Sequence, residues 1–368
     1  MGFSKRLHCL RWNSRKTGLQ EAGVAVVKRK GATTRPESIG RVLLAWYARS
    51  KRDLPWRASS PDPYAVWVSE IMLQQTQVER VREFFVRFME RFPTVHDLAA
   101  AREPTVLKYW EGLGYYRRAR QLHAAAKQIV HEHGGEFPRT VEGLRSLPGI
   151  GRYTAGAIGS IAFDLATPIV EANSRRVIAR LVGHAAPLDG PGGDEPIWEI
   201  AAGLVPPRHP GRFNQALMDL GAMICTPKLP LCSRCPLASA CVAHQTNRVA
   251  AIPAQAKRRP VKQVQETAVV LRHGESVLVE RRGPGEWWEG LWDFPRGSGT
   301  AAKRGRRLGL VTYSVTHHRI ECAVREQIMT RRTTPTKAQR WVKVTSLDAL
   351  AMTAPGRRIA RLVARSGD

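Results

Sequence analysis

The chain has 368 residues, and its 58 lysines and arginines outnumber its 31 aspartates and glutamates, giving a formal net charge of +27. At about 150 residues per domain we expect two domains, and this positive surplus favours a nucleic-acid partner, with a merely solvated basic surface as the alternative. We find no apolar run long enough to span a bilayer and no signal-peptide pattern, so we expect no insertion into a membrane. We expect a soluble, cytoplasmic protein, associated with the nucleoid if the source is bacterial.

The first 36 residues form a basic segment without sustained periodicity. They contain nine lysines or arginines and one acidic residue, Glu21, a composition that favours disorder. We therefore expect a disordered tail over residues 1–36. An organelle transit peptide and a start codon assigned too early are the alternatives.

Helical periodicity begins near Ile39, and the first helix is expected to end at Leu54-Pro55, because proline disfavours the helical conformation of the residue before it. From Asp62-Pro63 the pattern predicts a single long helix, since apolar side chains recur at helical spacing as far as Phe85. Glu70 borders this apolar stripe. A carboxylate there is either a boundary residue with its head in water or a desolvated acid whose pKa is raised toward neutrality.

The segment 113–120, with the sequence LGYYRRAR, places two aromatic rings beside three arginines. Aromatic rings stack on bases and arginines hold phosphates, so this combination suits a contact with DNA. Tyrosines in a helical domain more often pack in the core, which is the alternative for this segment.

Residues 146–177 set a glycine turn, a helix of small residues and a carboxylate one after another. Gly149 and Gly151 bracket Ile150, and helical residues follow from Arg152. Glycines can adopt a positive φ and let a ligand approach the backbone, and free amides at a helix start attract phosphate. The pattern indicates a helix-hairpin-helix, and the alternative is a tight turn only.

Four cysteines within 17 residues give the strongest chemical signal: Cys225, Cys232, Cys235 and Cys241. A disulfide framework is not expected in an intracellular chain, so the C-x6-C-x2-C-x5-C spacing indicates metal ligation. Zinc sites usually show two close pairs, whereas only one is present here, and four thiolates also suit a [4Fe–4S] cluster. Spacing alone leaves both open. Cys9 and Cys322 are left over, as a tail thiol and a strand residue.

After His244 comes a basic connector, and from Gln265 the hydrophobic period changes from that of helices to that of strands. We expect strands over the segments ETAVVLR, SVLVERR, GLWDFPRG and VTYSVTHHRIECAV, and a terminal helix from Leu347. The pattern predicts a mostly α part followed by an α+β domain.

Four stretches and the cysteine loop occur in the order found in one known family. They are SEIMLQQTQV at 69–78, GLGYY at 112–116, LPGIGRYTAGA at 147–157 and FNQALMDLGAMIC at 213–225. Over about residues 39–245 the chain resembles the MutY family of adenine DNA glycosylases, in the helix-hairpin-helix superfamily. The C-terminal part is similar, more weakly, to that family's Nudix-like domain.

The resemblance implies a six-helix barrel beside a cluster domain, with a [4Fe–4S] cluster on the four cysteines. It also implies a monomer that flips and removes adenine mispaired with 8-oxoguanine or guanine in double-stranded DNA. The expected regions are a tail at 1–36, the glycosylase and cluster region at 37–245, a connector at 246–264, and a lesion-recognition domain at 265–368.

The resemblance further implies catalytic roles. Glu70 would protonate the leaving adenine at N7, and Glu171 would steady the oxocarbenium-like sugar, with Tyr153 and Asn173 flanking that sugar. Around Glu171 the chain has Glu-Ala-Asn where the family has Asp-Gly-Asn, so a DNA-binding relative that has lost turnover is the alternative function. Related strand-cutting enzymes carry a lysine nucleophile at the position of Tyr153, so the tyrosine predicts hydrolysis without efficient strand cleavage.

Further residues match family positions that contact DNA. Leu73, Gln75 and Tyr115 match residues beside 8-oxoguanine, Trp56, Arg57 and Gln215 match the adenine pocket, Gly149 and Gly151 form the hairpin, and Thr316 and His317 match a segment reaching 8-oxoguanine. Core packing of Trp56, N-capping of a helix by Asn173 and a plain strand loop at 315–317 are the alternatives. Nudix-type nucleotide hydrolysis is not expected, because residues 297–308 lack the acidic side chains that hold Mg²⁺.

Overall fold

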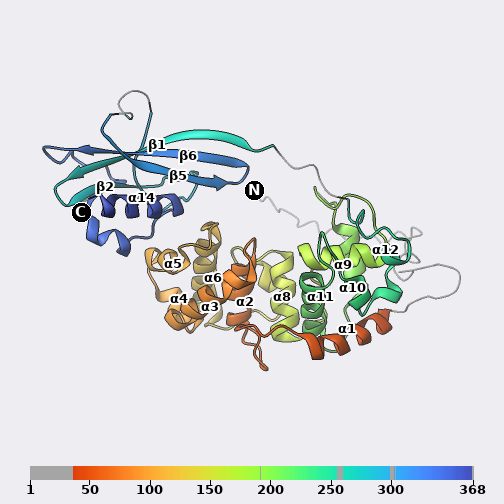
Figure 1. The fold of residues 1–368 in the computed structure, drawn as a ribbon. Helices are drawn as coiled ribbons and strands as arrows, with labels where there is room; N and C mark the ends of the chain where they lie inside the picture. The colour runs from red at the N-terminus through yellow and green to blue at the C-terminus, as the bar shows by residue number, and fades with distance from the viewer. Residues whose placement is uncertain (1–35, 191, 255–259, 299–301, 303, 367–368) are drawn as a thin grey trace, which may run out of the picture. The chain divides into compact units, whose positions relative to one another are not determined.

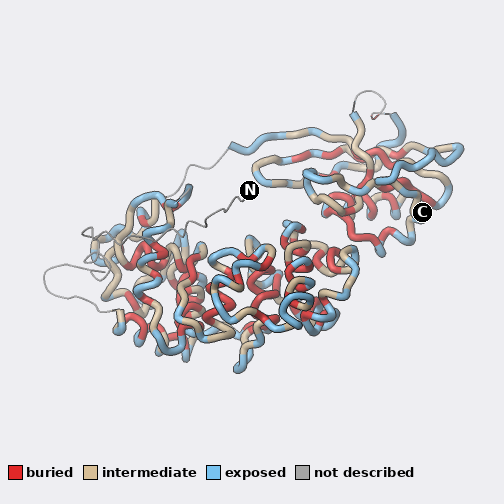
Figure 2. Tube along the Cα trace, turned by 180° about the vertical axis from the view of Figure 1, so that it is seen from behind, coloured by how far each residue is buried: buried red, intermediate tan, exposed pale blue. Residues whose placement is uncertain are grey.

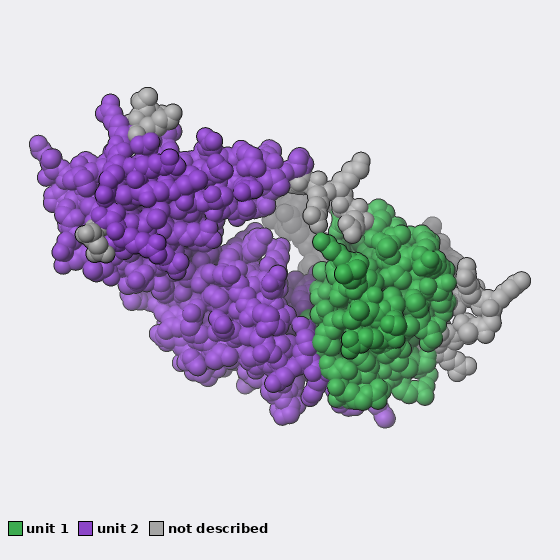
Figure 3. Space-filling view, viewed as in Figure 1, with its two compact units in different colours: residues 1–50, 170–206, 215–254 green, residues 51–169, 207–214, 255–368 purple. Residues whose placement is uncertain are grey.

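The computed structural model describes residues 36–190, 192–254, 260–298, 302 and 304–366. The tail expected over residues 1–36 therefore lies, but for Pro36, outside the described residues. The chain divides into two compact units, which Figure 3 distinguishes by colour. The first unit comprises Met1–Ser50, Val170–Pro206 and Gln215–Ala254, and the second comprises Lys51–Ile169, Pro207–Asn214 and Gln255–Asp368.

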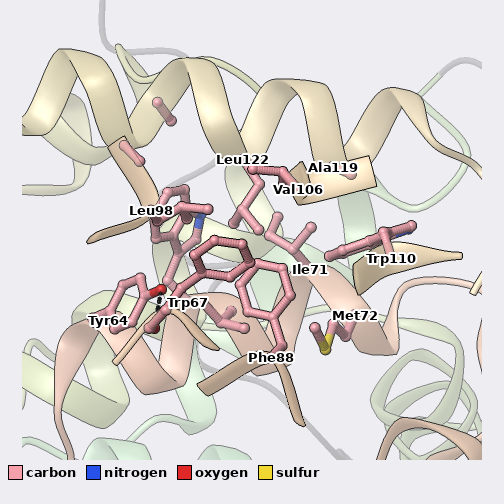
Figure 4. Packing of buried hydrophobic residues seen from close by; sticks show 14 of the residues in the cluster. Tyr64, Trp67, Ile71, Met72, Phe88, Leu98, Val106, Trp110, Ala119 and Leu122 are labelled. Carbon is pink, nitrogen blue, oxygen red and sulfur yellow. Dashed lines mark hydrogen bonds between the residues drawn. The ribbon is translucent and has the colours of Figure 1, made fainter. Parts of the chain in front are cut away.

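Helices form the N-terminal part of the second unit (Figure 1): α2 (Pro63–Leu73), α3 (Val78–Arg91), α4 (Val95–Ala100), α5 (Glu103–Trp110), α6 (Arg117–His133), α7 (Val141–Arg145) and α8 (Arg152–Phe163). Their apolar faces share one core, in which Trp67, Phe88 and Trp110 are fully buried and pack around Ile71 (Figure 4). Phe88 and Trp110 meet edge to face with ring centroids 6.1 Å apart, an arrangement that aromatic pairs favour. This core fixes α2, the helix that carries Glu70.

The prediction of one long helix after Asp62-Pro63 is wrong at its middle. The start is as expected, because the Asp62 carboxylate caps α2 by accepting from two amides of the first turn, each at 3.1 Å. The helix ends at Leu73, however, and α3 begins only at Val78. Between them Gln75 has a φ of 58°, a left-handed conformation that interrupts a right-handed helix. The apolar spacing continues across this break, so periodicity alone conceals it.

The first unit is helical as well. It contains α1 (Pro36–Ser50), α9 (Ala172–Val182), α10 (Glu195–Leu204), η1 (Cys232–Arg234), η2 (Ala238–Ala240) and α12 (Val242–Gln245), while α11 (Pro210–Met223) runs from the second unit into the first. Helix α9 contacts α10 and α12, and α1 contacts α10. Arg180 of α9 donates to the carbonyls of Thr226 at 2.7 Å and Ile252 at 2.9 Å. These bonds anchor the cysteine-bearing segment to α9.

The C-terminal part of the second unit is a seven-stranded sheet with a helix against one face (Figure 1). The strands are β1 (Lys262–His273), β2 (Ser276–Arg281), β3 (Trp292–Asp293), β4 (Arg296–Gly297), β5 (Arg306–Val315), β6 (His318–Ile328) and β7 (Gln339–Lys343). The order is β3-β2-β1-β6-β5, with β4 paired to β1 and β7 to β2. Strands β1 and β6 run parallel. Helix α14 (Ala354–Arg365) buries Ile359 and Val363 against sheet residues such as Val311.

The predicted fold class is confirmed: a mostly α part precedes an α+β domain. Strands occur in all the expected segments, and Figure 2 shows buried residues along the sheet. The segment GLWDFPRG, however, holds two short strands, β3 and β4, and VTYSVTHHRIECAV is divided between β5 and β6 by a turn. Strand β7 was not predicted. The terminal helix begins at Ala354 rather than Leu347, because Val344–Ala349 form the 3-10 turn η3 and the Thr353 hydroxyl caps the new helix by accepting from the Gly356 amide at 2.9 Å. No helix among the described residues is long and apolar enough to cross a membrane.

Candidate functional site

Glu70 and Tyr153, which lie 83 positions apart in the chain, meet in the second unit. Glu70 sits on α2 and is 4% exposed, and Tyr153 lies in the first turn of α8, the helix that packs against α2. The Tyr153 hydroxyl donates to Glu70 Oε2 at 2.5 Å. A short bond of this kind is typical of a hydroxyl donating to a carboxylate. The arrangement gives a buried acid that a phenol holds in one orientation.

The glycine hairpin lies directly before α8. Gly149 has a φ of 77°, and a Cβ added there would lie 2.7 Å from Gln121 Cβ, so both backbone conformation and space require glycine. Gly151 differs: its φ of −88° suits any residue, and a Cβ there would meet no described atom within 4 Å. Gly151 is the N-cap of α8, and no described side chain caps that helix end. The start of a helix carries a partial positive charge, which is the feature that attracts phosphate groups to such positions.

Glu171 lies in the first unit, as the N-cap of α9. Its carboxylate accepts from the Asn173 amide at 2.7 Å and the Ser174 amide at 2.8 Å, and the Glu171 amide donates to Ser174 Oγ at 2.9 Å. This is a capping box. Asn173 does not cap the helix, which was the alternative role for it. Its Oδ1 accepts a hydrogen bond from Arg176 at 2.9 Å instead.

The environment of Glu171 acts on its ionisation in two directions. Burial raises the pKa of the carboxyl above its ordinary value, and the two amide hydrogen bonds and Arg176 partly oppose this rise. Glu171 and Asn173 belong to the first unit, and Glu70 and Tyr153 to the second.

Gln75 and Tyr115, two of the three residues expected to wedge beside a lesion, occupy the tips of two loops in the second unit. Both are exposed, Tyr115 by 56%, and both have a positive φ, 58° and 48°. Leu73 is half-buried at the end of α2, against the helical core. The structure thus places two strained, exposed side chains on neighbouring segments of one unit.

The residues expected in an adenine pocket have different surroundings. Trp56 is 8% exposed and packs edge to face on Phe85 with centroids 5.5 Å apart, as core packing predicts. Arg57 donates to the Arg52 carbonyl at 3.4 Å. Gln215, in the first unit, accepts from the Tyr47 hydroxyl at 3.2 Å. Trp56 is therefore part of the hydrophobic core of the second unit.

All four cysteines of the 225–241 loop line one hollow of the first unit, together with Arg180 and His244. Arg180 Nη1 lies 3.3 Å from Cys225 Sγ, in a geometry for donation to sulfur. Burial raises the pKa of the Cys235 thiol to about 11 and also raises that of Cys241. Among the described residues, no group of three or more His, Cys, Asp or Glu side chains is placed to hold a metal ion. Four thiols lining one hollow fit the ligand chemistry of an iron–sulfur cluster, and they fit that of a zinc ion as well.

Thr316 and His317 form the turn between β5 and β6. Thr316 is exposed, with a φ of 53°, and the rings of His317 and His318 lie 4.1 Å apart. His318 also contacts Trp287, with centroids 5.2 Å apart, and Trp287 is 41% exposed. The turn is therefore part of an accessible aromatic surface.

Sequence reasoning missed Arg118 and Thr154. Arg118 is buried in α6 and bonds to the loops that carry Gln75 and Tyr115, and Thr154 Oγ1 accepts from Gln74 Nε2 at 3.3 Å. Arg118 is the second of two arginines that follow Tyr115 and Tyr116, and that cluster was a visible signal, although it indicated a contact with phosphate rather than a buried side chain. Nothing local marked Thr154, because its partner lies 80 positions away.

Two family models match the chain. Residues 68–189 match the HhH-GPD superfamily of base excision DNA repair proteins, and residues 267–362 match the NUDIX domain. The helical part, with its glycine hairpin and buried acid, thus defines a protein of the base excision repair class that carries a Nudix-like domain.

Relatives narrow this class. Adenine DNA glycosylase of Rattus norvegicus is 43% identical over 287 residues, 75% of this chain and 53% of that protein. Adenine DNA glycosylase of Buchnera aphidicola (strain Sg) is 35% identical over 256 residues, 69% of this chain and 74% of that protein. The chain belongs to the adenine DNA glycosylase family, as its sequence resemblance indicated. It spans about half the length of the mammalian relatives it matches.

The fold has a solved counterpart as well. A thermostable thymine-DNA glycosylase is similar with a TM-score of 0.52 and 29% identity, over 57% of this chain and 97% of that one. The similarity covers just over half of this chain, so a large part of it has no counterpart in that protein.

Proposed function

We propose that this protein is a monofunctional DNA glycosylase that hydrolyses the N-glycosidic bond of adenine paired with 8-oxoguanine or guanine. It would act as a monomer on double-stranded DNA and flip the adenine out of the stack. The hydrogen bond between Tyr153 and buried Glu70 carries the proposal. A buried, oriented carboxyl is suited to protonate a leaving base. A phenol in place of an amine at position 153 gives no Schiff base, so base release would proceed without strand cleavage.

Glu171 is the second carboxylate in this proposal. Its negative charge would stabilise positive charge on the deoxyribose, and the amides of Asn173 and Ser174 would hold that charge in place. Asn173, fixed by Arg176, would border the sugar.

The same observation favours a second candidate function. Both carboxylate oxygens of Glu171 accept from amides of its own helix, so the group is committed to capping α9. A glutamate that only caps would leave a protein that binds and scans DNA without turnover. Base release by the wild-type protein separates the two candidates.

Most of the residues that would read the bound DNA belong to the second unit. Exposed Gln75 and Tyr115, with Leu73 behind them, would fill the stack beside 8-oxoguanine, and the hairpin glycines Gly149 and Gly151 would receive the phosphate backbone. Arg57 and Gln215 would contact the adenine, and Trp56 would support that contact from the core.

The sheet domain would read the lesion. Thr316 offers an exposed hydroxyl and His317 an imidazole at one turn, which are suitable hydrogen-bonding groups for an oxidised guanine edge. Nucleotide hydrolysis is not part of the proposal, because the segment after β4 contains basic residues where a Mg²⁺-binding site needs acids.

We also propose that Cys225, Cys232, Cys235 and Cys241 hold a [4Fe–4S] cluster. Four thiols lining one hollow match the ligand chemistry of such a cluster, and Arg180 beside Cys225 Sγ would offset thiolate charge. When bound, the cluster would cross-link the 225–241 loop. Arg180 would tie that loop to α9, the helix that Glu171 caps.

Single-turnover base release from a duplex with one adenine opposite 8-oxoguanine tests the function. We expect strand breaks only after alkali, because hydrolysis leaves an intact abasic strand. Glu70→Gln should remove activity and keep DNA binding, whereas Glu83→Gln, at an exposed site on α3, should behave as wild type. No base release from the wild type, with DNA binding intact, would favour the scanning protein. Breaks before alkali would contradict the monofunctional assignment.

A further inference from the structure

We propose that Arg118 is a positioning residue that clasps the two loop tips carrying Gln75 and Tyr115 and holds both in the conformation that engages DNA. The inference rests on the proposed function of those two residues. It assigns a separate role to a side chain that itself stays inside the protein, 9% exposed.

One half of the clasp holds the end of α2. Arg118 Nη1 lies 2.6 Å from the Ile71 carbonyl, 3.1 Å from the Met72 carbonyl and 2.6 Å from the Gln74 carbonyl, and donates to them. These oxygens belong to the last turn of α2 and its C-cap, where a helix leaves its carbonyls unbonded. A cation placed there ends the helix and fixes the position from which Gln75 turns outward.

The other half of the clasp holds the loop before α6. Arg118 Nη2 donates to the carbonyls of Leu113 at 3.3 Å and Gly114 at 3.2 Å. It also donates to Thr76 Oγ1 at 3.4 Å, and so bonds to the residue after one tip and the residue before the other. A single planar guanidinium therefore joins two segments that lie about 40 positions apart in the chain.

Both tips need external support, because neither is a glycine. Gln75 has a φ of 58° and Tyr115 a φ of 48°, and non-glycine residues hold such conformations only where the surrounding structure imposes them. The carbonyl of Gln74 and that of Gly114, the residues directly before each tip, are both bonded to Arg118. The clasp thus acts where each strained backbone turn begins.

Arg118 is a buried cation that has no acidic partner among the described residues. No described carboxylate forms an ion pair with it, and instead its guanidinium carbon lies 5.3 Å from the Trp110 ring centroid and 5.7 Å from that of Tyr115. Burial lowers its pKa to about 10. A buried cation without a counter-ion is costly for stability, so helix capping alone is a weak reason for its presence.

The test compares Arg118→Met and Arg118→Lys with Lys127→Met, a change at an exposed site on the same helix. Single-turnover base release is fitted for both the amplitude, which counts active molecules, and the rate constant of those molecules. We expect Arg118→Met to lower the rate constant on the order of tenfold to a hundredfold, the effect of a displacement of about 1 Å. Lys127→Met should match the wild type. A lower amplitude with an unchanged rate constant would overturn the proposal, because it would show a folding role only.

Arg118→Lys adds a readout that a purely structural role would not move. A buried lysine is charged at low pH and loses its proton as pH rises through its lowered pKa. We expect its rate constant, relative to wild type, to be partly rescued near pH 6 and to fall toward that of Arg118→Met near pH 9. A ratio that stays constant with pH would contradict the clasp.

Hydrogen exchange keeps the two proposals separable. In Arg118→Met the amides of 74–77 and 112–116 should exchange faster, while those in the middle of α6 keep their wild-type rates. This measurement tests the clasp even if the wild-type protein releases no adenine, an outcome that would contradict the proposed function alone. Wild-type exchange in both loops would contradict the clasp itself.

Discussion

The Tyr153 hydroxyl donates a hydrogen bond to the Glu70 carboxylate across the contact between α8 and α2, with 2.5 Å between the oxygens. The bond joins the helix that follows the glycine hairpin to the helix that carries the buried acid. The position of Glu70 is therefore coupled to that of the hairpin, and a change at either one should be felt at the other.

Tyr153→Phe should slow base release about tenfold to a hundredfold, because a hydrogen bond to a charged group contributes about 1.5–3 kcal/mol. DNA affinity should change little, since the bond lies inside the second unit. Single-turnover kinetics on the duplex with adenine opposite 8-oxoguanine measure this. Tyr64→Phe is the matched control, because its hydroxyl donates at 2.8 Å to the Phe92 carbonyl and not to an acid. An unchanged rate in Tyr153→Phe would remove Tyr153 from the site.

Glu171→Gln should change how stability depends on pH. The folded-state pKa of Glu171 is raised by burial, so the folded protein binds more proton than the unfolded chain just above the ordinary glutamate pKa. The stability gained from this extra proton binding is fully present below the ordinary glutamate pKa. It is lost as pH rises through the folded-state pKa. Wild type should therefore lose stability relative to Glu171→Gln as pH rises from about 4.5 toward neutrality. Tm measured for both proteins across this pH range checks the sign of this effect. A wild-type Tm that rises relative to that of Glu171→Gln as pH increases would contradict it.

The parts of this fold that depend on local chemistry were predictable from sequence. Asp62 before a proline marks the start of α2, alternating apolar residues mark most of the sheet, and the close spacing of the four cysteines marks a loop that gathers them around one hollow. Each of these signals acts within a few residues, so a short window of sequence contains both the cause and its structural effect.

The parts of the fold that depend on residues distant in the sequence were not predictable. The break between α2 and α3 is held by Arg118, 44 positions beyond Gln74, so no window of sequence around the break contains its cause. At α9 the usual preference for asparagine as N-cap pointed to Asn173, but Arg176 takes that side chain and Glu171 caps instead. Such competition between partners is decided by packing.

Gly149→Ala and Gly151→Ala should separate folding from DNA binding in the hairpin. Gly149→Ala should lower the free energy of unfolding by about 1–2 kcal/mol or more, because alanine is strained at a φ of 77° and its Cβ would meet Gln121. Gly151→Ala should fold as wild type, since its backbone is extended and its surroundings are open. It should nevertheless weaken DNA binding, because the added methyl group occupies the space left for the phosphate backbone. Tm and equilibrium DNA affinity, measured on both variants, check the pair. Wild-type affinity in Gly151→Ala would show that the hairpin does not approach DNA at this residue.

Cys235→Ser should lower the iron and sulfide content of the purified protein and its broad visible absorbance, because a serine hydroxyl replaces one thiolate in the 225–241 loop. Cys322→Ser is the matched control: Cys322 is a buried thiol on β6, outside that loop, with a raised pKa of its own. It should leave iron content unchanged. Because Arg180 binds the loop carbonyls and Cys225 Sγ from α9, Cys235→Ser should also lower Tm. If elemental analysis of the wild type found stoichiometric zinc and no iron, the proposed cluster would be wrong and the four cysteines would form a zinc site.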